Sequence, residues 1–400
     1  MKSKNYLLGI SLLLSLSACE KNDVNLDNID SETIASEGNE ISLMNDMIFP
    51  ESDLRSCIYK ANKWSNGEHI PYKFLSGSAT QKKKFKSFLN EWMAYANLYF
   101  YEVPASSNAT VRVQFDNSNS SASYVGTDAK YITNQSQWTV HFGWLKDNTA
   151  QNEYSRVILH ELGHVLGLKH EHQSPASPII WDEDKVYEWG KNTQGWSASQ
   201  TYSNVIKKYT ASETNYSSYD PNSIMTYGMD ARYTKNGITV KTNRELSSMD
   251  KSWMKQWYPF NGTKRLFRCY FPDWGRHFYT TNFDELKKIN KGETVESLLG
   301  KVYETQVSGT TKLYRYWNSK TADHFYTTNY NELGGGKGNY VYEHVEGYVY
   351  SSKKDNTLPL YRYYNSKTGE HFYTTNYNEI KDGKSLNFKY EGIACYILPN

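Results

Sequence analysis

The segment HELGHVLGLKH, residues 160–170, constrains the fold most, because it combines a helix with a forced turn. Apolar residues recur around it with helical spacing. His160 and His164 lie four residues apart, so they are stacked neighbours on one helix face, roughly opposite the apolar stripe. Gly167 is the residue type best able to adopt the left-handed conformation that ends a helix. We therefore expect the chain to turn back at Gly167 and to bring His170 toward the first two histidines.

Three imidazoles that meet in this way are typical of a catalytic zinc site. Zn²⁺ with three protein ligands keeps its fourth position for a water, whose pKa falls toward ~7. Glu161 lies beside His160 and can take the proton of that water without being a ligand. The alternative is a helix with solvent-facing histidines, but the glycine and the third histidine at fixed offsets make a chance match rare. The segment predicts one Zn²⁺ held by His160, His164 and His170, with Glu161 as the general base.

An internal repeat with a period of 47 residues occupies the C-terminal part. Its copies, LFRCYFPDWGRHFYTTN, LYRYWNSKTADHFYTTN and LYRYYNSKTGEHFYTTN, begin at Leu266, Leu313 and Leu360. No copy can bury an apolar face alone, so we expect a closed threefold architecture. A β-trefoil with four strands per repeat fits the length, and a single sandwich is the alternative because repetition does not fix topology.

Histidines recur at one position of the repeat, as His277, His324 and His371. A threefold metal site is one interpretation, but residues repeated identically are more often core or turn determinants, so we expect a structural role. The repeated aromatic residues could line shallow sugar-binding pockets or simply form a core. Aromatic residues make up 15% of the chain, which fits either interpretation.

The N-terminus MKSKNYLLGISLLLSLSAC has basic residues, an apolar run and then small residues, which is typical of a signal peptide over residues 1–18. The residues that end at Cys19 resemble the lipobox of bacterial lipoproteins, which implies lipidation of Cys19 and contact with a membrane only through that anchor. An ordinary cleaved signal is the alternative. Either way we expect an extracytoplasmic protein. A net charge of +2 gives no electrostatic case for nucleic acid.

The remaining chain divides by composition. Residues 19–58 are polar, acidic and without a period, so they indicate a lipid-anchored linker or pro-segment. Residues 59–260 contain strand-like stretches, ATVRVQFD and WTVHFGW, and helical spacing near Lys82–Leu98 and Glu153–Leu168. We expect an α+β catalytic domain there and an all-β domain, a β-trefoil, at residues 264–400.

The 160–170 segment matches H-E-x-x-H-x-x-G-x-x-H, the zinc signature of the metzincins. SIMTYG at residues 223–228 resembles the methionine-containing turn that metzincins carry beneath the zinc, with Met225 as its methionine. Tyr227 matches the tyrosine of the astacins. The resemblance implies that this tyrosine is a fifth zinc ligand, which swings out to stabilise the oxyanion.

Further residues extend the resemblance to the astacins over about residues 60–260. Glu171 matches the glutamate that anchors the new N-terminus after activation, and KWSNGEHIPYKF, Lys63–Phe74, resembles the start of an astacin catalytic domain. The resemblance implies a metzincin-type mixed sheet with an active-site helix. The family has Arg and Asp residues where this chain has Ser174, Pro175 and Ala176, so the substrate preference of the family is not implied.

The number of cysteines predicts that one thiol is left unpaired. With Cys19 lipidated, a closed trefoil would bring Cys269 and Cys395 together as a disulfide, because they lie in its first and last strands. Cys57 is then unpaired, and its thiolate could displace the zinc-bound water as in a cysteine switch. Asp53 resembles the astacin aspartate switch and is the second latency candidate. A free or differently paired cysteine is the alternative.

These observations predict an extracytoplasmic zinc-dependent endopeptidase that acts on protein or peptide substrates. Ser121–Ala129, SASYVGTDA, is a candidate edge strand that could pair with an extended substrate. The repeats are similar to a repeat appended to secreted bacterial hydrolases, which suggests a module that binds a glycan, a surface or the substrate. The alternative function is a glycan- or surface-binding lipoprotein with an inactive protease domain.

Overall fold

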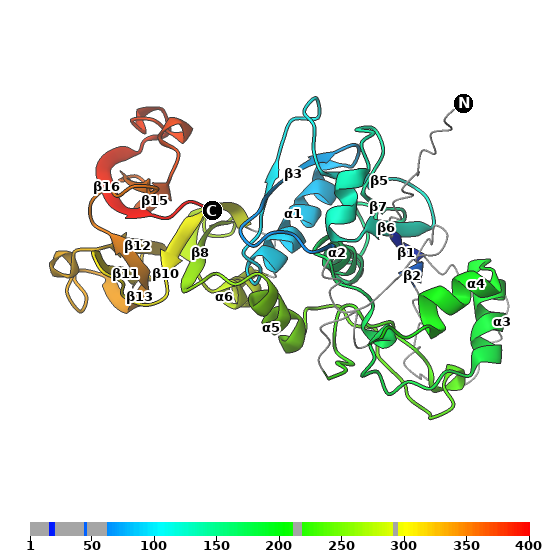
Figure 1. Ribbon diagram of the computed structural model, residues 1–400. Coiled ribbons are helices and arrows are strands. Elements are labelled where there is room, and N and C mark those ends of the chain that lie inside the picture. Colours follow the sequence, from blue (N-terminus) through cyan, green and yellow to red (C-terminus); the bar gives the residue numbers. More distant parts are fainter. Residues whose placement is uncertain (1–15, 21–43, 46–61, 211–217, 291–294) are drawn as a thin grey trace, which may run out of the picture. The chain divides into compact units, whose positions relative to one another are not determined.

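The computed structural model describes residues 16–20, 44–45, 62–210, 218–290 and 295–400. The chain forms two compact units (Figure 1). The first consists of Met1–Phe85 and Phe100–Gln256, and the second of Lys86–Tyr99 and Trp257–Asn400. In the described parts, no helix is both long enough and apolar enough to cross a bilayer.

The sheet of the first unit mixes parallel and antiparallel pairs. Its strand order is β2-β1-β6-β7-β5-β3-β4, in which β3, β5 and β7 are parallel and β6 is antiparallel to β7. The strands are β1 (Leu16–Glu20), β2 (Met44–Asn45), β3 (His69–Phe74), β4 (Tyr99–Glu102), β5 (Val111–Phe115), β6 (Ser120–Tyr124) and β7 (Val140–Phe142). The mixed sheet is confirmed, and so are the strands expected in ATVRVQFD and WTVHFGW.

Strand β6 covers only the first half of the predicted edge strand. After Tyr124 the chain forms the 3₁₀ helix η2 (Gly126–Tyr131), so a strand through Ala129 was wrong. Gly126 has a φ of +52°, and a Cβ there would lie 1.8 Å from the carbonyl oxygen of Asn62, so only glycine fits where η2 begins. The outer side of β6 pairs antiparallel with β1, an extended segment of the same chain, so the expectation that this strand forms a sheet edge was also wrong.

Helix α2 (Gln151–Val165) contacts β6 and β7 and carries the histidine motif. Every residue from Val157 to Val165 is buried, so the face opposite the apolar stripe is also covered. The other helical segments among the described residues are α1 (Ala79–Met93), η3 (Glu171–Gln173), α3 (Glu183–Gln194), α4 (Ala198–Thr201), η4 (Tyr202–Ile206), η5 (Ala231–Tyr233), α5 (Ser248–Trp257), α6 (Phe283–Asn290), η6 (Tyr330–Glu332), η7 (Tyr377–Glu379) and η8 (Lys384–Leu386).

The second unit is mainly β, and each copy of the repeat forms a hairpin whose first strand also pairs with the third. The strands are β8 (Thr263–Phe271), β9 (Arg276–Thr280), β10 (Val295–Tyr303), β11 (Thr310–Asn318), β12 (Asp323–Thr327), β13 (Tyr340–Tyr350), β14 (Leu358–Asn365), β15 (Glu370–Thr374) and β16 (Lys389–Ile397). The described residues therefore provide three strands per copy rather than the four expected, and the β-trefoil is not confirmed.

A ring of three tyrosines joins the copies. The hydroxyl of Tyr373 donates to the carbonyl oxygen of Tyr326 over 3.0 Å, and the backbone N–H of Tyr373 donates to the hydroxyl of Tyr279 over 2.7 Å. Tyr326 and Tyr279 are linked in the same manner. All three are buried, so the repeats close around a shared centre.

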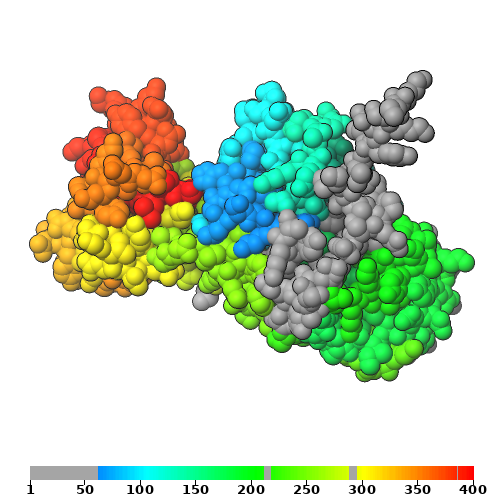
Figure 2. Space-filling model, in the orientation of Figure 1, coloured from blue at the N-terminus to red at the C-terminus, as the bar shows by residue number. Residues whose placement is uncertain are grey.

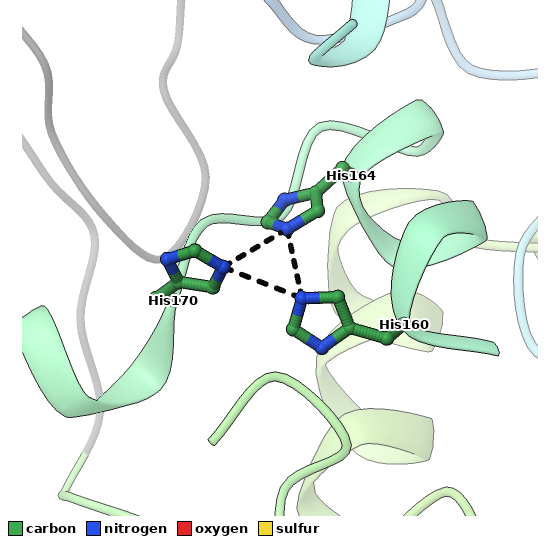
Figure 3. A group of neighbouring side chains, drawn as sticks. All are labelled: His160, His164 and His170. Atoms are coloured by element: carbon green, nitrogen blue, oxygen red, sulfur yellow. Dashed lines mark hydrogen bonds between the residues drawn. The ribbon is translucent and has the colours of Figure 1, made fainter. Parts of the chain in front are cut away.

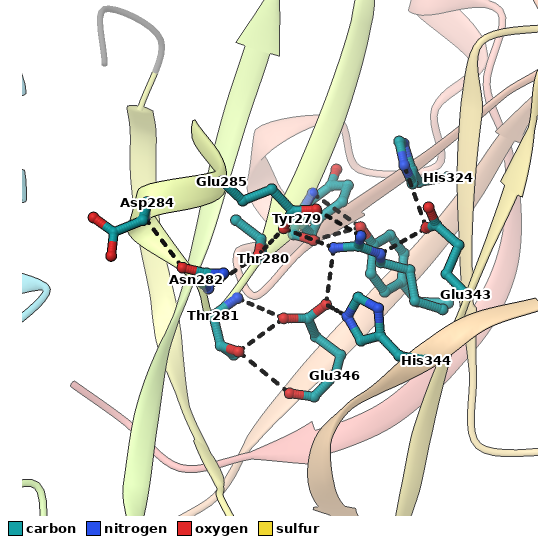
Figure 4. Close-up of polar contacts among 12 residues, drawn as sticks. Tyr279, Thr280, Thr281, Asn282, Asp284, Glu285, His324, Glu343, His344 and Glu346 are labelled. Carbon is teal, nitrogen blue, oxygen red and sulfur yellow. Dashed lines mark hydrogen bonds and ion pairs between the residues drawn. The ribbon is translucent and has the colours of Figure 1, made fainter. Parts of the chain in front are cut away.

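An arginine in each copy adds ion pairs around this centre. Arg315 pairs with Glu343 over 2.7 Å, with Glu285 over 2.8 Å and with Glu346 over 3.2 Å (Figure 4). These glutamates come from the first and second copies, so the arginine ties one copy to the next.

The predicted disulfide is not formed. Cys269 and Cys395 are free, buried thiols. Cys269 packs in a cluster with Phe267 and Phe278, whereas Cys395 packs in another with Leu360. Strand β8 pairs with β9 and β10, and β16 pairs with β13 and β14, so first and last strands are not neighbours as a closed trefoil required.

Two of the three repeated histidines pair with acids of another copy, and the third lies near an acid of its own copy. His277 Nδ1 lies 2.6 Å from Glu370, and His371 Nδ1 lies 2.7 Å from Asp323. His324 lies 3.6 Å from Glu343. These contacts agree with the structural role expected for the three histidines.

Candidate metal centre and active site

The three predicted ligands come together. The Nε2 atoms of His160, His164 and His170 lie 3.0 to 3.3 Å from one another (Figure 3). Nδ1 of His160 is 2.8 Å from the carbonyl oxygen of Ile224, and Nδ1 of His164 is 2.7 Å from that of Leu168. Since a carbonyl only accepts, each Nδ1 carries the proton and each Nε2 presents a lone pair.

The donor set fits zinc. Within the described residues, His160, His164 and His170 are the group whose ligand atoms could hold a metal ion. Burial, followed by the proximity of His170, holds the pKa of His160 well below its usual value. A neutral imidazole is the form that binds a metal, so the set is ready for an ion such as Zn²⁺.

The turn that delivers His170 is built on Gly167, as predicted. Its φ is +100°, its N–H donates to the carbonyl oxygen of His164, and Leu168 N–H donates to that of Gly163. These bonds cap the end of α2 and reverse the chain.

Met225 lies directly against α2. A Cβ added to Gly163 would approach Met225 Sδ to 2.4 Å, so the glycine makes room for the methionine. Glu171 N–H donates to the carbonyl oxygen of Met225 over 3.0 Å. The turn with Met225 therefore lies beneath the histidines, as the resemblance implied.

Asp250 on α5 holds this turn, and the sequence analysis missed it. Its carboxylate accepts from Ile224 N–H over 2.9 Å and from the hydroxyl of Ser223 over 2.7 Å. Ser247 and Asp250 form a reciprocal capping pair at the start of α5. The S-x-x-D spacing was the available signal. Because the carbonyl oxygen of Ile224 is the acceptor for His160, Asp250 supports a ligand through this one residue.

Tyr227 lies beside the histidines. Its ring centroid is 4.4 Å from that of His170 and 6.2 Å from that of His160. His172, a residue the sequence analysis did not single out, stacks on Tyr227 at 4.3 Å and an interplanar angle of 30°. The tyrosine is thus fixed within reach of the site by His172.

Glu161 is fully buried next to the ligands and is oriented by β6. The hydroxyl of Ser123 donates to Glu161 Oε2 over 2.7 Å and also lies 3.0 Å from its carbonyl oxygen. The sequence analysis placed Ser123 in the predicted edge strand but gave it no role at the active site. Its contact links β6 to Glu161.

Other predicted residues fall elsewhere. Glu171 Oε1 accepts from the N–H of Asp220 over 3.1 Å, and its role as an anchor for the N-terminus remains a prediction. Cys57 and Asp53 lie outside the described residues. Cys19 belongs to β1, and its lipidation also remains a prediction.

Comparison with known proteins gives two family matches. The model of the astacins, a family of peptidases, matches residues 56–253, nearly half of the chain. A domain of unknown function (DUF5648) matches residues 226–334 and again residues 265–398, which cover the repeats.

Individual relatives resemble the catalytic half. Protein SpAN of Strongylocentrotus purpuratus is 28% identical over 180 residues, which are 44% of this chain and 26% of that protein. The match therefore spans about a quarter of that curated relative.

Two solved structures also match. The structure of myroilysin is 37% identical, covers 51% of this chain and 98% of that chain, and has a TM-score of 0.49. High choriolytic enzyme 1, a hatching enzyme zinc-protease from Oryzias latipes, is 20% identical, covers 50% and 94%, and has a TM-score of 0.35. With the family match over the histidine motif and the converging donors, the chain belongs, through residues 56–253, to the astacin family of zinc metalloendopeptidases.

Proposed function

We propose that the chain is an extracytoplasmic endopeptidase that hydrolyses internal peptide bonds of protein substrates. The observation that carries the proposal is the convergence of three histidine Nε2 atoms beside Glu161 and Tyr227. A buried set of ligands, base and tyrosine is what such hydrolysis requires.

Each residue has a distinct role. His160, His164 and His170 would hold one Zn²⁺, which supplies Lewis acidity. Glu161 takes the proton of the attacking water and returns it to the leaving amine. Tyr227 donates a hydrogen bond to the oxyanion that develops on the scissile carbonyl.

The β6 strand provides the surface for the substrate. Strand β1 of the same chain pairs antiparallel with that side of β6, so an extended peptide can pair with this backbone once β1 has left it. Backbone pairing depends little on side chains, so we expect broad selectivity with one or two defined pockets.

The decisive test is cleavage of gelatin by processed protein with and without a zinc chelator, alongside Glu161→Gln. We expect chelation to abolish cleavage and Glu161→Gln to lower it about 10²- to 10⁴-fold while zinc remains bound. Cleavage that survives both changes would contradict the proposal. Complete inactivity of the wild-type protein would favour the alternative, a surface-binding protein with an inactive protease domain.

We further propose that the chain is synthesised as a lipid-anchored zymogen. Cys19 would carry the lipid, and Cys57, or else Asp53, would block the metal until the pro-segment is removed. Mass spectrometry of the mature N-terminus tests the lipid, with Cys19→Ala as control. Basal activity of uncleaved Cys57→Ser and Asp53→Ala separates the switches, since only loss of the true blocking residue should raise activity. We also propose that the repeat domain binds a substrate or surface.

A further inference from the structure

The three copies share one surface position, but its chemistry differs between them. The position is formed by corresponding residues of each copy: Phe267, Phe283 and Val295 in the first; Tyr314, Tyr330 and Tyr342 in the second; Tyr361, Tyr377 and Tyr390 in the third. We call the second and third sets the tyrosine triads. The first set is apolar, whereas each triad adds three hydroxyl groups.

In the first copy this position is covered by the chain itself. Phe267 and Phe283 are buried, and Ala94, from the helix end that belongs to the same unit, packs against their cluster. The hydroxyl of Tyr95 donates to the carboxylate of Asp284 over 2.8 Å. The segment with Ala94 and Tyr95 is therefore held here by apolar rings and a charged group.

In the second and third copies the same position faces solvent. Tyr330 is 44% exposed, Tyr377 is 41% and Tyr390 is 37%. Figure 2 shows these copies, coloured orange to red, as part of the molecular surface. The rings form compact groups, with centroids 5.1 Å apart for Tyr314 and Tyr330 and 5.3 Å apart for Tyr361 and Tyr377.

No residue of the triads is itself charged. Asn331 and Asn378 replace Asp284, and both are exposed. The acids that follow them are neutralised, because Glu332 pairs with Arg362 and Glu379 with Arg268. In the second and third copies, neutral asparagine amides therefore stand where the first copy has a charged carboxylate.

The hydroxyl groups of the triads serve no internal contact. Tyrosines that belong to the fold have acceptors: Tyr316 donates to the carbonyl oxygen of Gly334, and Tyr363 to that of Lys381. Across residues 295–400, no hydrogen bond to protein holds a triad hydroxyl. These groups remain available to a ligand.

We propose that the two tyrosine triads are binding sites for a neutral carbohydrate. A sugar ring has an apolar C–H face that packs on an aromatic ring, and hydroxyls at its rim that can bond tyrosine hydroxyls and asparagine amides. A phosphate or an acidic polymer would need cationic partners, and no triad residue is cationic. This inference rests on the binding role proposed for the repeat domain and is independent of peptidase activity.

Two equivalent sites in one domain favour a polymer. A polysaccharide repeats its units, so one chain, or neighbouring chains on a surface, can occupy both triads. Once one triad is bound, binding at the other gains from the raised effective concentration of the polymer. A weak contact at each site then gives firm attachment, which a single shallow aromatic site would not.

The test is affinity electrophoresis of the full chain in gels that contain mannan, xylan or mixed-linkage β-glucan. We expect at least one of these polymers to retard it. Tyr330→Ala or Tyr377→Ala should weaken binding about tenfold, and the double variant at least ~100-fold. Tyr330→Phe should have an intermediate effect. Tyr131→Ala, which removes an exposed tyrosine of the other unit, is the control and should bind normally.

Thermal unfolding and gelatin cleavage of the same variants should be unchanged, which separates this inference from the peptidase proposal. The inference is overturned if no neutral polymer retards the chain, or if the double variant binds like the wild type. It is also overturned if polygalacturonate or a proline-rich peptide binds through the triads in place of the neutral polymers.

Discussion

At the scale of single residues, Ser123 determines how the general base is held. It donates to Glu161 Oε2 over 2.7 Å in a fully buried setting. A hydrogen bond to a charged group contributes about 1.5 to 3 kcal/mol, so we expect Ser123→Ala to lower kcat about 10- to 100-fold. Zinc content and KM should change little, because Ser123 contacts neither a ligand nor the partner strand through this hydroxyl.

The matched control is Ser121→Ala, which removes a buried hydroxyl from the same strand that bonds Gly143 N–H instead. Equal losses of kcat in the two variants would show that β6 is merely destabilised. Loss of zinc in parallel with kcat in Ser123→Ala would also contradict the assignment.

Gly163 is the second residue whose role rests on one contact. Gly163→Ala would place a Cβ 2.4 Å from Met225 Sδ, and both are buried, so the turn must shift. Overpacking of this kind costs about 1 to 3 kcal/mol. Denaturant unfolding should show that loss in the free energy of unfolding. In a Met225→Ala background the same substitution should cost much less, and a cost that persists there would exclude the methionine as the cause.

At the scale of elements, α5 supports the metal centre through its first turn. Asp250→Ala would leave Ile224 N–H, Ser223 and Ser247 without their buried acceptor, at about 1 to 3 kcal/mol for each group. We expect a loss of roughly 3 kcal/mol or more in unfolding free energy, together with faster zinc release, because Ile224 also holds His160.

Asp230→Ala is the comparison for this prediction. Asp230 forms an exposed pair with Arg232, and such pairs contribute under ~1 kcal/mol. If Asp250→Ala were no more costly than Asp230→Ala, the cap would not support the centre.

The elements that sequence could predict are those with a local cause. The α2 motif and the reversal at Gly167 follow from spacing and from one residue's backbone freedom, and both are confirmed. The close approach of Gly126 to Asn62, just after β6 ends, is a distant contact that no local pattern reveals. Asp250 acts from a helix 25 residues beyond Met225, so only its capping pattern was visible.

At the scale of the whole molecule, the 47-residue period predicted three joined copies but not their internal topology. The tyrosine ring that joins them depends on identical residues, which a sequence displays. The disulfide failed because it was inferred from a trefoil in which first and last strands meet. In the structure the two thiols lie in separate clusters, a fact of strand order rather than of composition.

The copies are not identical at their junctions, and one difference is a buried acid. The hydroxyl of Thr281 donates to the backbone carbonyl of Glu346, while its counterparts Thr328 and Thr375 donate to those of Ala394 and Leu299. Glu346 therefore occupies the position that is apolar in the other copies. Its carboxylate is satisfied by Thr281, Arg315 and His344 (Figure 4).

This acid should make the stability of the repeat domain depend on pH. Burial alone would raise the pKa of Glu346, but hydrogen bonds and charge from His344 and Arg315 hold it below the ordinary 4.5. A pKa that is lower in the folded state contributes stability above 4.5, and that contribution is lost as pH falls through the folded pKa. Glu346→Gln should therefore unfold about 1 to 3 kcal/mol more easily at about pH 7.

The difference between wild type and Glu346→Gln should shrink as the pH falls below 4.5, because protonation removes the same charge from the wild type. Urea unfolding, followed by tyrosine fluorescence at a series of pH values, measures the free energy of unfolding on both sides of the folded pKa. Glu304→Gln, at an exposed acid, should show no such dependence. If the difference in unfolding free energy stayed constant with pH, the glutamine would destabilise the domain through its shape rather than through the lost charge. The ion pairs of Glu346 would then contribute little to joining the first two copies.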